Sequence, residues 1–337
     1  MACHRASGRQ RAVKIKNIYY KSHVLHGRGF LHWDTISAMI KNFFLLLILT
    51  LSACSTPAAD SPQAASPSTG TPVVLATTTF LADIAQNVAG DRLYVASLLP
   101  IGADPHSYQP TPQDVAKVTE STLLITNGAD FEHFLDTILK NAGGQRTVVE
   151  ASAGLKVRGA AGAVDPHLWL DPNNVIQYVE NIRAGLAQVD PAGVDVYAAN
   201  AKAYTAQLQE LDTWIREQVN SIPAERRLLV TNHDSLGYFS ERYGFTVIGT
   251  VVEGTSSLAA PSAQQMSALI DQIKATGAPA VFLDAAESPT LAKQIASDSG
   301  VKVVTDLYIG SLTDGPPAAT YIDMLKYDVS TIVEALK

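Results

Sequence analysis

Histidine is the residue type whose placement in this chain most clearly suggests chemistry. Four of the eight histidines (His4, His23, His26 and His32) lie near the N-terminus, and the other four are His106, His133, His167 and His233. Of these, His106, His167 and His233 follow apolar, strand-like runs, in short segments rich in Asp, Pro and Asn. Neutral imidazole is a common ligand of Zn²⁺ and, less readily, of Mn²⁺. The three residues could therefore form a nitrogen-rich metal site.

A single loop histidine more often makes ordinary structural contacts than binds a metal. His133 fits that interpretation, because it sits inside a helical pattern, FEHF, with no partner motif. The other three become candidates only if they converge in space. Ligands of open α/β folds gather at the carboxyl ends of strands, which is where the sequence places these three residues.

The elements expected to position the histidines alternate between strand and helix from Val73 onward. Helical segments such as 111–120 and 131–141 separate β-rich apolar runs. Such spacing predicts parallel α/β units whose sheets are covered on both faces. The expected strands are 73–80, 93–99, 123–126, 147–150, 227–233, 245–251, 280–286 and 301–306.

A longer helix is expected from Pro191 to Ser221, between the two series of strands. Its apolar residues recur at intervals of three and four, which predicts one buried face of a helix about 45 Å long. We expect an α/β fold with two lobes of parallel β-sheet flanked by helices and joined by this linking helix. The predicted divisions are an N-terminal lobe over 73–188, the linking helix over 189–222 and a C-terminal lobe over 223–337. The apolar positions are Tyr197, Ala201, Tyr204, Leu208, Leu211, Ile215 and Val219.

The N-terminal region carries the pattern of an export signal. Residues 43–53 form an apolar run preceded by Lys41 and followed by Cys54. A bilayer span needs about 20 apolar residues, so this run is too short for one and is typical of a secretory signal. Its exit, LSAC, resembles the bacterial lipobox, whose cysteine is lipidated. We therefore predict lipidation at Cys54 and an extracytoplasmic, membrane-anchored location on the periplasmic or cell-surface side.

The segments around this signal are interpreted from their composition. Residues 1–38 form an unusually long and mixed leader, and Met39 is the expected initiator, so 39–54 is the predicted signal peptide. Residues 55–72 are rich in Pro, Ser and Ala and are expected to form a flexible tether.

The charge argues against nucleic-acid binding, and the cysteine content excludes a disulfide or a thiolate metal site in the folded part. Residues 1–54 hold 8 of the 25 basic and 1 of the 32 acidic residues, leaving 17 basic and 31 acidic residues and a net charge of about −14. That surface opposes binding to nucleic acid, which needs clustered positive charge. The two cysteines are Cys3 and Cys54, so the folded part has neither a disulfide nor a thiolate metal site.

Three segments resemble signature loops of one protein family. GADPHSYQPTPQD (102–114), VDPHLWLDP (164–172) and TNHDSLGYF (231–239) resemble loops of the metal-binding lipoproteins of ABC importers for zinc and manganese, bacterial solute-binding protein family 9. TYIDMLKYDVSTIVEAL (320–336) resembles the family's closing helix. The resemblance runs from about Val73 to the C-terminus. It implies two α/β lobes with a metal held between them.

The resemblance also implies roles and partners. It carries metal-ligand roles onto His106, His167 and His233, which occupy the histidines of the three matching loops. The implied partners are a Zn²⁺ or Mn²⁺ ion as transported ligand, a membrane permease and a cytoplasmic ATPase. We expect the chain to act as a monomer.

One position departs from the family's pattern. Family members commonly supply a carboxylate ligand from a loop resembling LYSDSL, whereas this chain reads LYIGSL over 307–312, with Gly310 in place of the aspartate. Glycine has no side chain to donate. Asp306, Asp314 or a water molecule could complete the metal's coordination, and the residues do not choose between them.

The choice of metal follows from opposing observations. Three imidazoles without a confirmed carboxylate favour Zn²⁺, because Mn²⁺ prefers hard oxygen ligands. However, many zinc-uptake members carry a His/Asp-rich loop, and the corresponding region, 141–165, contains no histidine. The expected ion is zinc, with manganese next.

Two other functions compete with metal transport. A zinc site with three histidines and an open position also occurs in hydrolytic enzymes. The chain has no HExxH string, Gly-x-Ser-x-Gly elbow or phosphate-binding glycine loop, so we do not expect an enzyme. A surface adhesin or scaffold lipoprotein is the other alternative, although an adhesin has no need of three histidines on strand-end loops.

Overall fold

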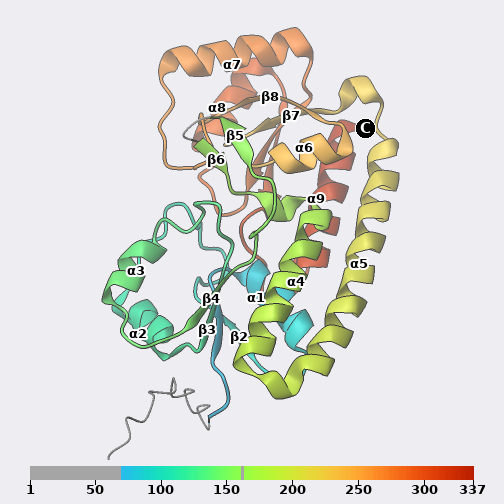
Figure 1. Ribbon diagram of the computed structural model, residues 1–337. Helices are drawn as coiled ribbons and strands as arrows, with labels where there is room; N and C mark the ends of the chain where they lie inside the picture. Colours follow the sequence, from blue (N-terminus) through green and yellow to red (C-terminus); the bar gives the residue numbers. More distant parts are fainter. Residues whose placement is uncertain (1–69, 161–162) are drawn as a thin grey trace, which may run out of the picture. The chain divides into compact units, whose positions relative to one another are not determined.

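The computed structural model describes residues 70–160 and 163–337, all within one compact unit. Two four-stranded sheets, ordered β2-β1-β3-β4 and β10-β9-β7-β8, contain only parallel pairs. A small antiparallel hairpin pairs β5 (Arg158–Ala160) with β6 (Ala163–Asp165) (Figure 1). Met39, Cys54, the predicted signal and the predicted tether, apart from residues 70–72, lie outside the described residues.

Alternate residues of the first sheet face two different layers of helices. Leu75 and Leu124 pack in a cluster with α2 and α3, whereas Val74 and Leu123 belong to the main hydrophobic core with α1 and α4. Figure 1 shows these helix pairs on opposite sides of the strands. Successive side chains of a strand point to opposite faces, so a strand covered on both faces is apolar throughout. The strands are β1 (Val74–Ala76), β2 (Val95–Ser97), β3 (Leu123–Thr126) and β4 (Thr147–Glu150), and the helices are α1 (Thr79–Ala89), α2 (Pro112–Glu120), α3 (Leu135–Asn141) and α4 (Pro172–Val189).

The second sheet repeats the topology of the first. In chain order within each half, both sheets place their strands second, first, third and fourth. Val230 and Val281 pack with α7 and α8, and Leu229 and Phe282 face the main core. The strands are β7 (Leu228–Thr231), β8 (Thr246–Thr250), β9 (Ala280–Asp284) and β10 (Lys302–Leu307), and the helices are α6 (Gly237–Tyr243), α7 (Ala263–Thr276), α8 (Thr290–Ser299) and α9 (Tyr321–Leu336).

The long helix expected between the two halves is α5 (Val194–Asn220), which runs beside α4 (Figure 1). The α-helix begins after a short 3₁₀ turn at Pro191–Gly193, so Pro191 starts that turn instead. The buried residues of α5 are the seven apolar positions predicted from the sequence. They join a hydrophobic core that includes residues of both sheets, so one continuous core supports both lobes. The exact lobe boundaries stay a prediction.

Several elements differ from the sequence expectation. The strand predicted over 73–80 ends at Ala76, because α1 already begins at Thr79. The helix predicted from residue 131 begins at Leu135, because the chain first turns through positive φ angles at Gly128, Ala129 and Asp130. Helix α4 was not expected, although Asp171 caps it and Pro172 occupies its first turn, a common start signal.

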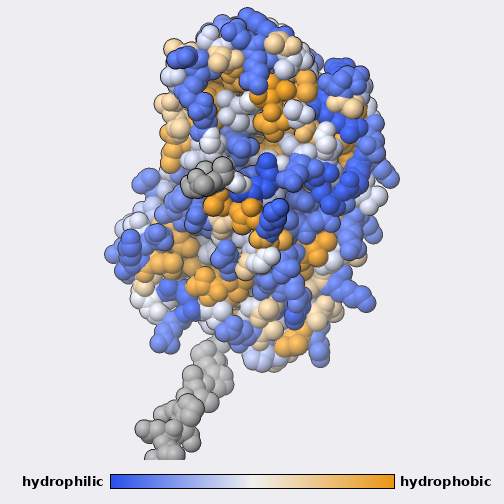
Figure 2. All heavy atoms as spheres, turned by 45° about the horizontal axis from the view of Figure 1, so that its top comes forward, coloured by the Kyte–Doolittle hydropathy of each residue, from blue (hydrophilic) through white to orange (hydrophobic). Residues whose placement is uncertain are grey.

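The surface has no single dominant apolar area on the face drawn in Figure 2, where hydrophobic residues form separate patches between hydrophilic ones. Within residues 70–160 and 163–337, no helix combines the length and apolar character needed to cross a bilayer.

The remaining short helices are 3₁₀ turns, η1 (Leu168–Leu170) and η3 (Ala224–Arg226).

Candidate metal centre

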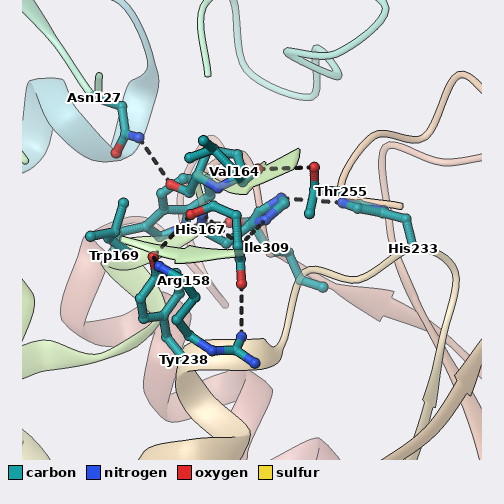
Figure 3. Close-up of polar contacts among 12 residues, drawn as sticks. Asn127, Arg158, Val164, His167, Trp169, His233, Tyr238, Thr255 and Ile309 are labelled. Atoms are coloured by element: carbon teal, nitrogen blue, oxygen red, sulfur yellow. Dashed lines mark hydrogen bonds and ion pairs between the residues drawn. The ribbon is translucent and has the colours of Figure 1, made fainter. Parts of the chain in front are cut away.

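The three predicted histidines meet at one point. His106 lies between β2 and α2, His167 between β6 and η1, and His233 two residues beyond β7. One ring nitrogen from each lies within 4.8 Å of those of the other two. The Nε2 atoms of His167 and His233 are 3.2 Å apart, and Figure 3 shows these two side chains directed toward one another. Two of the residues therefore come from the half that contains the first sheet and one from the half that contains the second.

In two of these rings, the Nδ1 atom forms a hydrogen bond with a carboxylate. The Nδ1 atom of His167 lies 3.0 Å from Oδ1 of Asp165, and Nδ1 of His233 lies 2.7 Å from Oε1 of Glu287. An ionised carboxylate only accepts hydrogen bonds, so each Nδ1 carries the proton and each Nε2 keeps its lone pair. Two such lone pairs 3.2 Å apart repel one another unless a cation lies between them. Nitrogens bound tetrahedrally to Zn²⁺ are separated by about 3.3 Å.

The charge state of the site also suits metal binding. His167 and His233 are buried and His106 is partly buried. Burial, with the neighbouring rings of His167 and His233, lowers the pKa of His106 to about 3. Burial and His233 hold the pKa of His167 well below its ordinary value. Both rings are therefore neutral near pH 7, which is the form that binds a metal ion.

A cavity of about 20 Å³ adjoins the three rings, large enough for roughly one water-sized sphere. The apolar part of its wall comes from Pro105, Phe131, Trp169, Ala286 and Ile309, and its acidic part from Asp104, Asp284 and Glu287. Its volume matches one water molecule or one ion and excludes an organic molecule.

Two of the acidic residues are already hydrogen-bonded through both carboxylate oxygens. Asp284 accepts from the backbone N–H groups of Ala286 and Gly310, at 2.7 Å each, and burial raises the pKa of this carboxyl group to about 6. Asp104 accepts from the backbone of His106 at 2.9 Å through Oδ1, and from Ser107 and Ser257 at 2.8 and 2.7 Å through Oδ2. These hydrogen bonds connect the loops around the cavity.

Gly310 lies at the cavity wall, as the resemblance implied. A Cβ atom at this position would stand 3.4 Å from Cδ of Pro105 and 3.6 Å from Oδ2 of Asp284. Neither suggested replacement for a carboxylate here lines the cavity. Asp306 is exposed and accepts a hydrogen bond from the Tyr327 hydroxyl at 2.7 Å, and Asp314 is also exposed.

The fourth histidine lies away from the site, whereas two carboxylates that the sequence did not indicate belong to it. His133 is exposed in a turn just before α3, outside the cavity, rather than inside a helix. Asp165 belongs to the DPH motif, but the motif alone does not indicate its contact with the His167 ring. Glu287 was not recognised, because it is 54 residues from His233 and carries no motif of its own.

Hydrogen bonds join the two halves of the chain around the site. Thr255 donates to the backbone oxygen of Val164 at 3.2 Å (Figure 3). The Trp169 indole N–H donates to the carbonyl of Ile309 at 2.8 Å. These contacts hold both sides of the cavity in one arrangement.

Similarity to known proteins agrees with this architecture. The family model described as zinc-uptake complex component A, periplasmic, matches residues 74–335. The chain belongs to this family. It is 35% identical over 298 residues to the manganese-binding lipoprotein MntA of Halalkalibacterium halodurans, covering 87% of this chain and 97% of that protein.

Two further relatives extend the comparison. The iron-binding protein YfeA of Yersinia pestis is 35% identical over 267 residues, covering 77% of this chain and 85% of YfeA. The structure of the periplasmic zinc-binding protein TroA from Treponema pallidum aligns with a TM-score of 0.74 at 30% identity, covering 79% of this chain and 99% of TroA. The predicted family and the two-lobed α/β fold are thus confirmed.

Proposed function

We propose that this chain captures a divalent transition-metal ion outside the cytoplasm and delivers it to an ABC-type importer. His106, His167 and His233 would bind the ion. The observation that carries the proposal is the 3.2 Å separation of the His167 and His233 Nε2 atoms. That distance is close to the roughly 3.3 Å between two nitrogens that share a tetrahedral zinc ion.

Zinc is the favoured ion and manganese the next. Three imidazoles form a nitrogen-rich site, which binds Zn²⁺ more tightly than Mn²⁺ in the Irving–Williams order. The names of similar proteins include manganese, iron and zinc, so family membership alone does not select the metal. The choice therefore rests on the donor atoms.

The partners follow from the family's place in transport. The importer's permease would receive the ion from a monomeric carrier, tethered to the membrane through a lipidated Cys54. The net negative charge of the predicted mature chain speaks against nucleic acid as a partner.

A transport role also accounts for the site better than catalysis does. A cavity of about 20 Å³ leaves no room for an organic substrate beside a bound ion. An adhesin would gain nothing from buried histidines held by carboxylates.

Deletion of the gene tests this function in cells. Accumulation of zinc, or of manganese, should fall in metal-poor medium. The wild-type gene should restore it, and a gene encoding His233→Ala should not, although the variant protein is present at the same level. Unchanged accumulation of both metals in the deletion strain would instead support the adhesin alternative.

A further inference from the structure

Glu287 is the acidic residue at the cavity in which only one of the two carboxylate oxygens accepts a hydrogen bond. Oε1 accepts from Nδ1 of His233 at 2.7 Å. Oε2 is buried and has no hydrogen-bond partner among the residues that the structure describes. A buried carboxylate oxygen left without a partner is costly, so it suggests a ligand that the protein is built to receive.

The other acidic side chains of the cavity do not offer such an atom. Both oxygens of Asp284 accept backbone N–H groups, and both oxygens of Asp104 accept hydrogen bonds from neighbouring loops. Gly310 contributes no side chain at all. Glu287 is therefore the acidic residue of this cavity that has a buried carboxylate oxygen without a hydrogen bond.

The position of Glu287 favours an indirect contact with the metal. The groups that could bind an ion together are the three histidines, and Glu287 is outside that set. Its Oε1 also holds the nitrogen of His233 that faces away from the metal, and direct binding would disrupt this contact. A water molecule bound to the metal could bridge the gap and would fit the cavity of about 20 Å³.

We infer that Glu287 replaces the carboxylate missing at position 310: Oε1 orients His233, and Oε2 accepts a hydrogen bond from a water molecule that fills the fourth coordination position of the bound metal. The inference rests on the proposed metal-binding function. It gives this chain a site of three histidines and one water, in place of three histidines and an aspartate.

Manganese provides a direct test of the water molecule. Full-length protein loaded with Mn²⁺ should show the enhanced water-proton relaxation that a metal-bound, exchanging water produces. Gly310→Asp should lower it, because the new carboxylate occupies the fourth position. Gly310→Ala is the steric control, since a Cβ fits 3.4 Å from Pro105, and it should leave the relaxation unchanged.

The role of Glu287 is tested by removing its charge. Glu287→Gln should weaken Zn²⁺ binding about 10- to 100-fold, because the amide cannot accept hydrogen bonds at both positions. Adding Gly310→Asp to this variant should restore most of the affinity. The exposed Glu253 provides a matched control, and Glu253→Gln should bind like wild type.

Each contrary result has a definite meaning. Wild-type affinity in Glu287→Gln would overturn the inference, as would relaxation in the wild type equal to that of Gly310→Asp. Reduced affinity in Glu287→Gln without any metal-bound water in the wild type would also overturn it, because Glu287 would then act without a water molecule. Failure of the wild-type protein to bind either metal, or undiminished binding by His167→Ala, would instead refute the proposed function.

Discussion

Replacing Asp165 with asparagine should weaken metal binding without touching a ligand atom. Oδ1 of Asp165 accepts from Nδ1 of His167 at 3.0 Å, and Oδ2 accepts from Nη1 of Arg158 at 2.8 Å. An asparagine has one acceptor oxygen for these donors, to which the backbone N–H of His167 adds a third, 3.1 Å from Oδ1. If that oxygen faces Arg158, the amide N–H group meets Nδ1 of His167 and moves the ring's proton to Nε2. The nitrogen directed at the metal then no longer has a free lone pair.

The expected loss can be estimated from the role of the contact. Carboxylates that orient a metal-binding histidine typically contribute about 10- to 100-fold to affinity, or about 1.4–2.7 kcal/mol. The ion pair with Arg158 adds little to stability, because about a third of the Arg158 side chain is exposed. The free energy of unfolding of the metal-free variant should therefore change by only about 1–3 kcal/mol, the cost of one buried group left without a partner.

A competition titration with a chromophoric chelator measures the change for Zn²⁺. Asp212→Asn provides the matched control, because Asp212 also pairs with an arginine, accepting from Nη2 of Arg242 at 2.9 Å, but lies outside the cavity. The control should lose a similar amount of stability and keep its affinity. The reasoning fails if Asp165→Asn binds zinc within twofold of wild type, or if Asp212→Asn loses as much affinity.

Three further outcomes follow from the same site. In the metal-free protein, the pKa of His106 near 3 means that the folded state binds fewer protons than the unfolded state between about pH 6.5 and 3, so the free energy of unfolding falls as the pH is lowered through this window. In urea titrations from pH 6 to 4, His106→Gln should show a shallower fall in this free energy. An equal slope would contradict the assignment. Trp169→Phe leaves the buried carbonyl of Ile309 without its donor and should cost about 1–3 kcal/mol in urea unfolding, whereas an unchanged midpoint would show that the contact contributes nothing. Zinc at about 1,000 times its dissociation constant should stabilise the wild type by about 4 kcal/mol, seen as a higher melting temperature, and a matching shift in His167→Ala would argue for binding elsewhere.

The sequence predicted a helix well where its buried face requires apolar residues at regular intervals. The stripe from Tyr197 to Val219 became the buried face of α5, because a helix packed on one core must repeat apolar residues every three or four positions. Boundaries were less predictable. At Gly128–Asp130 the local backbone turns through positive φ angles, and α3 starts later than its apolar pattern suggests.

The candidate site was predictable only in part. The convergence of His106, His167 and His233 could be expected, since parallel strands bring their carboxyl ends to one edge. The surrounding carboxylates could not, because whether Glu287 or Asp306 reaches the cavity depends on tertiary packing of distant loops. Asp306 is nearer in sequence to the missing ligand, yet its side chain turns outward to Tyr327.

The most direct test of the central claim is the metal content of the purified protein after equilibration with Zn²⁺ and removal of unbound ion. The account predicts one tightly held ion per wild-type chain and none in His167→Ala, with both proteins folded by circular dichroism. A wild-type chain that retains no metal, or a His167→Ala variant that retains one ion, would contradict it.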